Sequence, residues 1–258
     1  MGTDFSGLAG LSEALATARL AVTRPFEVVD RIKGKRERRR SGPPCEIAGI
    51  RADVFDAVHE FLGVPTCRTC ADENRAMSRE VDAQSPNGHP LDGGPTLAQT
   101  LWILARHHKP TMVVETGVAR GVSSAFLLGA LERNGDGHLW SLDLPMLRAG
   151  WRVETGCAVP DRLRDRWTYI RRSSRRGLPP LLADLGSVDM FVHDGLHTSE
   201  TMAFEFGSVW PRLTEKGLLV TDDAEASTAF MDFARRVGGA PMLLSEAGKA
   251  SVIGVLRR

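Results

Sequence analysis

The second half of the chain alternates short apolar runs with stretches of helical period. The runs have the length and composition of buried strands, and the stretches between them repeat apolar residues every three to four positions. Strands are predicted at Met112–Val114, Leu139–Leu142, Thr168–Arg171, Met190–Val192 and Leu218–Val220. Strands that alternate with helices indicate a doubly wound, mostly parallel α/β sheet of the Rossmann-like class.

The intervening helices are predicted from the same periodicity. They are Leu97–His107 (capped by Thr96), Ser123–Leu131, Leu181–Leu185, Ser199–Trp210 and Ser227–Val237. The last segment, Pro241–Leu256, predicts two strands around Glu246–Gly248, with no helix between them that could form a parallel crossover. We therefore expect a seven-stranded sheet with an antiparallel edge pair.

The N-terminal part follows a helical pattern interrupted by loops. Leu11–Lys33 has helical period and is broken by Pro25, and Asp53–Leu62 predicts a short amphipathic helix. Ser41–Pro44 predicts a linker, and Ser85–Gly94 predicts a loop. The expected division is a helical extension over residues 1–92, which caps the substrate site, and an α/β domain over residues 93–258.

Composition narrows the classes of function. Of 258 residues, 42% are hydrophobic and 25% charged, as in globular proteins, and the net charge of +1 argues against a protein that mainly binds nucleic acid. Arg31–Arg40 holds seven basic residues and one acid, Glu37. The run could be an anion-binding arm, but a solvated helix end is the favoured interpretation.

Targeting and cysteine signals are weak. No apolar run is long enough to span a membrane, and the N-terminus lacks the basic cluster of a secretory signal, so we expect a cytoplasmic protein.

Cys67 and Cys70 have C-x-x-C spacing, but a zinc site needs two more ligands. Cys45 and His59 are the nearby candidates, and their spacing matches no standard zinc finger. Reduced structural thiols are therefore expected.

A glycine-rich turn follows the first strand, and it predicts a cofactor site. The turn is Glu115-Thr116-Gly117-Val118-Ala119-Arg120-Gly121, followed by Ser123 and Ser124 at a helix start. Its E-x-G-x-x-x-G spacing differs from the G-x-G-x-x-G of dinucleotide-binding proteins. A pyrophosphate needs a run of amides, whereas the cationic sulfonium of S-adenosylmethionine favours carboxylate or carbonyl oxygen. The turn therefore favours S-adenosylmethionine, with Glu115, Thr116, Gly117, Gly121, Ser123 and Ser124 around it.

Two later strands complete this expected site. Asp143 ends the second strand, where an acid can accept hydrogen bonds from both ribose hydroxyls. Because nicotinamide cofactors use an acid in the same way, Asp143 indicates an adenosine ligand without saying which one. Ser173 follows the third strand, where an adenine edge would lie.

Acidic residues follow two further strands. His193-Asp194-Gly195-Leu196-His197 and Thr221-Asp222-Asp223 each end a buried-type strand. If these strands are neighbours, about 4.8 Å apart, their three aspartates converge in one coordination sphere. Crowded carboxylates repel one another, and an oxygen-preferring dication such as Mg²⁺ relieves the repulsion. The alternative for Asp222 and Asp223 is a helix cap.

The two histidines are assigned different roles. His197 lies beyond the strand and can return to the ligand side, where its near-neutral pKa suits a general base. Capping or packing is its alternative role. His193 should point to the face opposite Asp194, because side chains alternate along a strand, and is expected to be structural.

These segments together resemble a known family. The stretch from about Thr111 to Asp223 is similar to bacterial macrocin- and mycinamicin-type sugar O-methyltransferases and, more distantly, to cephalosporin hydroxylase-type proteins. The likeness is carried by Glu115–Gly121, Ser141–Pro145, His193–His197 and Gly217–Asp223. The resemblance implies that Asp194, Asp222 and Asp223 hold magnesium, that Asp194 also borders the cofactor, and that His197 is the base. Asp222 stands where that family has glutamate.

The resemblance implies a metal-dependent O-methyltransferase that uses S-adenosylmethionine on a hydroxyl of a sugar or natural product. The expected partner is this small molecule, without nucleic acid or membrane, and a homo-oligomer is compatible with the sequence. Two alternatives are a nicotinamide-dependent oxidoreductase on the same fold and a non-catalytic cofactor-binding partner in a biosynthetic complex. The E-x-G-x-x-x-G spacing and the lack of a catalytic Tyr–Lys arrangement argue against the oxidoreductase.

Overall fold

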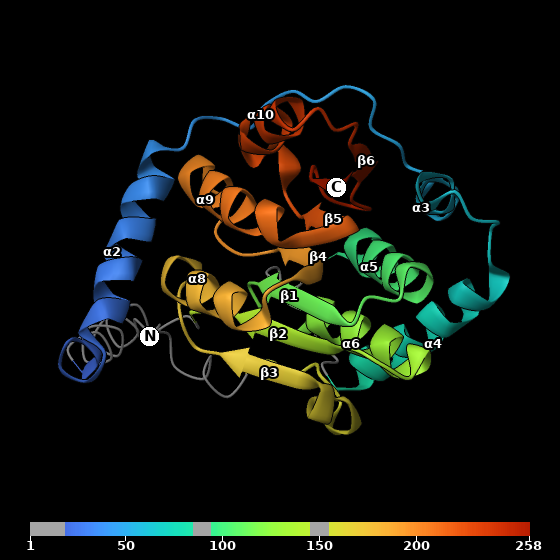
Figure 1. The fold of residues 1–258 in the computed structure, drawn as a ribbon, viewed down its shortest axis with the longest axis horizontal. Coiled ribbons are helices and arrows are strands. Elements are labelled where there is room, and N and C mark those ends of the chain that lie inside the picture. The colour runs from blue at the N-terminus through green and yellow to red at the C-terminus, as the bar shows by residue number, and fades with distance from the viewer. Residues whose placement is uncertain (1–18, 85–93, 145–154) are drawn as a thin grey trace, which may run out of the picture.

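The computed structural model describes residues 19–84, 94–144 and 155–258, and its centre is one seven-stranded sheet (Figure 1). The strand order is β3-β2-β1-β4-β5-β7-β6. Neighbours among β1 to β5 are parallel, and β7 is antiparallel to both β5 and β6. The strands are β1 (Met112–Thr116), β2 (His138–Leu142), β3 (Trp167–Ile170), β4 (Val188–His193), β5 (Leu213–Thr221), β6 (Met242–Ser245) and β7 (Val252–Arg257). The predicted mostly parallel sheet with an antiparallel edge pair is confirmed.

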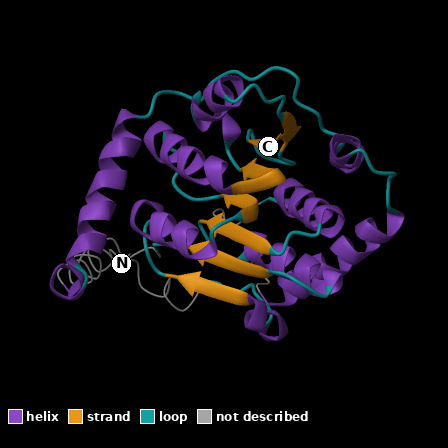
Figure 2. Cartoon of the chain, in the orientation of Figure 1, coloured by secondary structure: helices purple, strands orange, loops and turns teal. Residues whose placement is uncertain are grey.

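Helices cover both faces of the sheet (Figure 2). One face packs against α5 (Pro95–His108) and α6 (Val122–Asn134), and the other against α8 (Ser174–Leu185), α9 (Ser199–Val209) and α10 (Ala229–Arg236). Short 3-10 turns occur at η1 (Asp161–Arg166), η2 (Trp210–Arg212) and η3 (Ala224–Ala226). Because both faces of a parallel sheet are buried, its strands are apolar on both sides, which is why they were visible as apolar runs.

The N-terminal helices lie on two sides of the domain. Helix α2 (Pro25–Arg40) contacts α8 and α9 at the carboxyl edge of the sheet, the side to which the arrowhead of β3 points in Figure 1. The chain then passes β6, where Arg51 pairs with Leu244, and continues into α3 (Val54–Leu62) and α4 (Arg68–Gln84). These two helices share the core cluster of α5 and α6. Among the N-terminal helices that the structure describes, α2 is the one at the carboxyl edge, and α3 and α4 pack into the core of the domain expected to begin at residue 93.

Several local predictions differ from the structure. Thr96 is not the cap of α5: the helix begins at Pro95, and the Glu246 carboxylate accepts hydrogen bonds from the backbone N–H groups of Thr96 and Leu97 at 2.9 and 3.0 Å. Helix α4 was not predicted. Helix α8 begins earlier than expected, because it accommodates Pro179 and Pro180, which normally interrupt helices.

The helix expected to end near Lys33 continues as α2 to Arg40, whereas other N-terminal predictions are met within the described ranges. The break at Pro25 and the linker over residues 41–44 are confirmed, whereas residues 11–18 and 85–93 lie outside the described ranges. The basic run is the C-terminal part of α2 and is mostly exposed, as a solvated helix end would be. Within the described ranges, none of the helices is both long and apolar enough to cross a bilayer.

Candidate active site

The glycine-rich turn joins β1 to α6 at the carboxyl edge of the sheet. Gly117 has φ +89°, and a Cβ there would lie 1.9 Å from the carbonyl oxygen of Asp194. Gly121 has φ +88°, and a Cβ there would lie 2.9 Å from a methyl carbon of Val159. Both positions favour glycine because their backbone is left-handed, and at Gly117 a side chain would also clash with the backbone of Asp194. The turn is thereby pressed against the segment that follows β4.

The polar side chains around the turn mostly bond to one another. Glu115 is fully buried and accepts hydrogen bonds from the hydroxyls of Ser123, Ser124 and Ser141 at 2.7, 2.6 and 2.7 Å. Burial raises the pKa of Glu115, and the three hydroxyls oppose this by stabilising the carboxylate. Glu115, Ser123 and Ser124 therefore hold the shape of the turn, and their contact with a cofactor stays a prediction.

Thr116 also forms its hydrogen bonds within the protein. Its hydroxyl donates to Glu205 Oε2 at 2.6 Å, and its carbonyl oxygen accepts from the backbone N–H of Asp194 at 2.8 Å. Sequence analysis did not identify Glu205, which is a buried acid on the otherwise apolar inner side of α9. The sequence signal that could have identified Glu205 is its position between apolar residues on the buried face of a helix.

Asp143 lies directly after β2, where the sequence placed it. Burial raises its pKa to about 6, although backbone N–H groups of Ala119, Leu144 and Val118 donate to the carboxylate and favour its charged form. The phenol oxygen of Tyr169 is buried and has no hydrogen-bond partner among the described residues. Burial, and then the charge of Asp143, raise the pKa of this phenol. The chain's single tyrosine therefore lies beside Asp143, which the sequence pattern did not show.

Ser173 is not placed as expected. Its hydroxyl donates to Asp30 Oδ2 of α2 at 2.6 Å, so this group holds α2 against the start of α8 and is not directed at an adenine edge.

The three aspartates lie at the ends of neighbouring strands, as predicted. Strands β4 and β5 pair in parallel, and the backbone N–H of Asp222 donates to the carbonyl oxygen of His193 at 2.9 Å. Burial, and then the charges of Asp222 and Glu115, raise the pKa of Asp194 well above its ordinary value. Burial, and then the charge of Asp223, raise the pKa of Asp222 to about 7. The aspartates are close enough to disfavour one another's ionisation.

The carboxylates of the three aspartates are not gathered into one coordination sphere in this structure, so their joint metal binding stays a prediction. Within the described ranges, three candidate ligand atoms lie within 4.8 Å of one another only at Cys67, Cys70 and His107. Asp223 has a left-handed backbone (φ +48°), and its Oδ1 accepts a hydrogen bond from Ser251 at 2.6 Å. Its side chain is therefore drawn toward β7. Asp222 keeps one buried oxygen, Oδ1, without a hydrogen-bond partner among the described residues.

The two histidines lie side by side on the α9 face of this edge. Their ring centroids are 5.1 Å apart and nearly perpendicular. His193 is fully buried, and its Nδ1 lies 2.6 Å from Glu205 Oε2, which fits the predicted structural role. His197 Nε2 lies 3.5 Å from Asp223 Oδ2. Burial, and then the charge of His193, lower the pKa of His197 to about 4, below the near-neutral value expected from the sequence, so its ring is neutral at neutral pH.

Helix α2 lies over this edge and is held by buried ionic contacts. Glu37, the single acid of the basic run, accepts from the hydroxyls of Thr198 and Thr201 at 2.9 and 2.8 Å and pairs with Arg175 at 2.8 Å. Glu27 pairs with Arg171 at 2.9 Å. The charge of Arg31 on the same helix favours the carboxylate form of Asp143. Helix α2 therefore lies where the expected substrate cap would lie, and its role as a cap stays a prediction.

The carboxyl edge of the sheet lies within a region that matches a known family. Residues 114–224 match the model of a family described as "Methyltransferase domain". The matched range begins in β1 and ends at the start of η3, so it contains the glycine-rich turn, Asp143, the three aspartates and both histidines. No curated protein matches the chain in sequence.

Solved structures share the fold. The O-methyltransferase of Bacillus cereus, in complex with SAH, is 14% identical, with a TM-score of 0.53, and the alignment covers 80% of this chain and 98% of that one. TomG of Streptomyces achromogenes, an O-methyltransferase of tomaymycin synthesis in complex with SAM, is 17% identical, with a TM-score of 0.53 and coverage of 80% and 96%. The SAH-bound methyltransferase PaMTH1 of Podospora anserina is 13% identical, with a TM-score of 0.52 and coverage of 83% and 99%.

Proposed function

We propose that this chain, which carries a class I methyltransferase domain, transfers a methyl group from S-adenosylmethionine to a hydroxyl oxygen of a sugar or another natural product. The observation that carries the proposal is the gathering of three features at one sheet edge. These are a glycine-rich turn after β1, an acid after β2, and an acid–histidine cluster after β4 and β5. Solved proteins of this fold include O-methyltransferases in complex with SAM or SAH.

The cofactor would lie against the turn and Asp143. Gly117 and Gly121 keep the backbone free of side chains, and the Asp143 carboxylate would accept hydrogen bonds from the ribose hydroxyls. Two such donors favour the ionised carboxylate and offset the burial that now raises the pKa of Asp143. S-adenosylmethionine, when bound, supplies the electrophilic methyl group.

The chemistry of Asp194, Asp222 and Asp223 fits a divalent cation. Asp222 Oδ1 is a buried oxygen without a hydrogen-bond partner in the described ranges, and the carboxylates disfavour one another's charge. A dication offsets both effects, and oxygen ligands are those that Mg²⁺ prefers. When bound, such an ion supplies Lewis acidity toward the acceptor hydroxyl.

His197 would take the proton from the acceptor hydroxyl. Its ring is neutral, and its Nδ1 is buried and has no hydrogen-bond partner among the described residues. The Asp223 carboxylate, 3.5 Å from Nε2, would stabilise the imidazolium that forms. Glu205 contacts both His193 and Thr116 and so fixes the residues next to His197.

The proposal places the enzyme in the cytoplasm, acting on a small molecule without a nucleic acid or membrane partner. Its direct test is turnover with S-adenosylmethionine, Mg²⁺ and a panel of sugar and natural-product alcohols, followed by mass spectrometry. The expected result is an acceptor product heavier by one CH2, formed in step with S-adenosylhomocysteine. If the cofactor binds and no acceptor is methylated, the chain is a non-catalytic binding partner. Hydride transfer with NAD would instead establish an oxidoreductase.

A further inference from the structure

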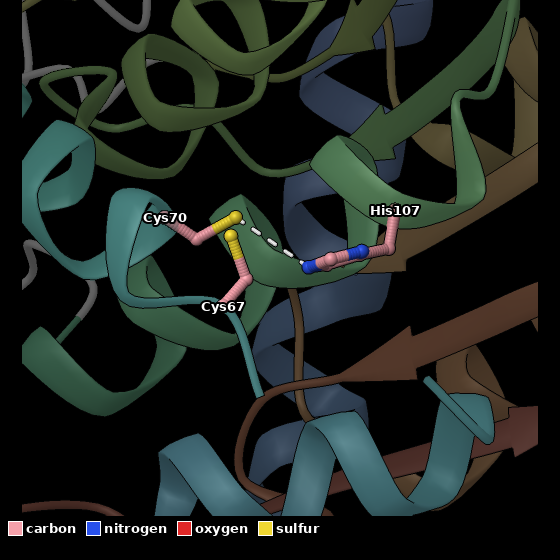
Figure 3. A group of neighbouring side chains, drawn as sticks. All are labelled: Cys67, Cys70 and His107. Carbon is pink, nitrogen blue, oxygen red and sulfur yellow. Dashed lines mark hydrogen bonds between the residues drawn. The ribbon is translucent and has the colours of Figure 1, made fainter. Parts of the chain in front are cut away.

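Two cysteines and a histidine meet far from the candidate active site. Cys67 directly precedes α4, Cys70 lies in its first turn, and His107 lies in the last turn of α5 (Figure 3). Their ligand atoms all lie within 4.8 Å of one another. Because α5 ends just before β1 begins, the cluster lies at the amino edge of the sheet, whereas the active-site residues lie at the carboxyl edge. Methyl transfer does not use these side chains.

The spacing of the cluster matches the edge of a small coordination tetrahedron. Cys70 Sγ lies 3.4 Å from His107 Nε2. Tetrahedral zinc with Zn–S about 2.3 Å and Zn–N about 2.0–2.1 Å places neighbouring sulfur and nitrogen ligands about 3.6 Å apart. Thiolate and imidazole are also the ligands that select zinc over magnesium or calcium. We propose that Cys67, Cys70 and His107 bind one Zn²⁺ ion.

The other sequence candidates take different places. Cys45 donates through its thiol to the carbonyl oxygen of Ser227, so it belongs to another part of the chain. His59 lies next to the site: its Nδ1 is 2.6 Å from the carbonyl oxygen of Phe55, and its Nε2 accepts from the backbone N–H of Cys67 at 3.2 Å. His59 therefore orients Cys67 from outside the ligand group. Cys67 and His107 are partly exposed, which leaves the fourth position to a water molecule.

The shifted pKa values of Cys67 and His107 favour the forms of these side chains that bind a metal. Hydrogen bonds from the backbone N–H and the side chain of Cys70 lower the pKa of the Cys67 thiol. Burial, and then the charge of His59, lower the pKa of His107, so its imidazole is neutral and has a lone pair for a metal. Burial, and then the side chain of Cys67, raise the pKa of the Cys70 thiol to about 12, so a bound Zn²⁺ would have to displace the proton of this thiol.

The ion would fasten α4 to α5. Besides the cluster, Arg106 of α5 pairs with Glu73 of α4 at 2.9 Å, and α4 places Met77 and Val81 in the core. A zinc ion held by both helices would fix the start of α4. Loss of the ion should loosen residues 68–84 first.

Cobalt substitution tests the site in the full-length protein, independently of methyl transfer. Reduced, metal-free protein is titrated with Co²⁺, which gives a thiolate-to-metal charge-transfer band and intense d–d bands in a tetrahedral sulfur site. We expect both signals to saturate at one ion per chain and to disappear when Zn²⁺ displaces Co²⁺. Cys67→Ser and Cys70→Ser should lose the charge-transfer band, whereas Cys157→Ser, another free cysteine, should keep it. Zinc should raise the Tm of the wild type and not of the double serine variant.

Circular dichroism checks that each variant folds. If the serine variants do not fold, His107→Gln keeps both thiols and should weaken cobalt binding at least tenfold. The proposal is overturned if folded, reduced wild type gives no charge-transfer band, or if Cys67→Ser/Cys70→Ser gives the same band. A Cys67–Cys70 disulfide that forms readily in wild type without any metal affinity would establish a redox pair instead.

Discussion

A side-chain carbon on Gly117 would lie 1.9 Å from the carbonyl oxygen of Asp194. This approach joins the turn proposed to hold the cofactor to the strand end proposed to hold the metal. The backbone N–H of Asp194 also donates to the carbonyl oxygen of Thr116 at 2.8 Å. The geometry of the proposed cofactor turn and that of the proposed metal site therefore depend on each other.

Gly117→Ala tests this dependence. The variant must bear both a left-handed backbone and a backbone clash, so we expect the free energy of unfolding to fall by about 2 kcal/mol or more. Gly135→Ala is the matched control, because Gly135 has φ +82° and open space around its Cβ position. It should lose only about 1–2 kcal/mol, from the backbone alone. Denaturant unfolding measures both variants, and equal losses would show that the contact with Asp194 is unimportant.

Helix α2 should detach from the site in acid. Burial alone would raise the pKa of Glu37, but hydrogen bonds from Thr201 and Thr198 and the charge of Arg175 lower it below its ordinary 4.5. A lowered carboxylate pKa contributes stability above pH 4.5, and this contribution is lost as the pH falls through the folded value. Hydrogen exchange of residues 25–40, corrected for intrinsic rates, should therefore accelerate at acid pH.

Glu37→Gln should produce the same acceleration at neutral pH, because the charged contacts with Arg175 and both threonines are weakened. Asp161→Asn, in an exposed pair with Arg164, is the control and should leave α2 protected. Unchanged protection of α2 in Glu37→Gln would show that Glu37 is not its anchor.

The two histidines should separate in function. His197→Ala should lower turnover by about 10²–10⁴-fold while cofactor binding is retained, and the loss should shrink at high pH, where more acceptor is ionised. His193→Ala should mainly lower the Tm, because it removes the ring beside the buried Glu205 carboxylate. The measurements are pH–rate profiles and melting curves. If His193→Ala removes activity in a folded protein and His197→Ala does not, the roles are exchanged.

Metal dependence is tested at the aspartates. EDTA should abolish methyl transfer, added Mg²⁺ should restore it, and Asp222→Asn should lose the restoration. The control Asp184→Asn, on the exposed side of α8, should respond to Mg²⁺ as the wild type does. Full turnover in a chelated preparation would contradict the metal proposal.

The sequence predicted the sheet and the place of each strand, because buried parallel strands appear as apolar runs, but β5 begins at Leu213 and not at the predicted Leu218. It could not predict how polar groups pair once the chain has folded. The cap of α5 is the clearest case: local rules selected Thr96, whereas the carboxylate comes from Glu246 in the distant β6–β7 connection. The hydrogen bonds of Ser123 and Ser124 to Glu115 were likewise not predicted from the sequence.

The sequence predicted the positions of those site residues that directly follow a strand. Asp194 and Asp222 adjoin because β4 and β5 are neighbours, and Asp143 follows from the place of β2. The orientation of Asp223 could not be predicted, because it depends on a left-handed backbone and on Ser251 of a distant segment. His107 was missed as a partner of Cys67 and Cys70 for the same reason: α5 brings it there only in the folded chain.

The central claim, an S-adenosylmethionine site at the carboxyl edge of β1 and β2, is tested most directly by calorimetry of S-adenosylmethionine binding. Wild type should bind S-adenosylmethionine and give no heat with NAD. Asp143→Ala should weaken binding by about 1.5–3 kcal/mol, because two charge-assisted ribose hydrogen bonds are lost. Asp184→Asn should bind as the wild type does. Binding of NAD without S-adenosylmethionine, or an unchanged dissociation constant in folded Asp143→Ala, would contradict the account.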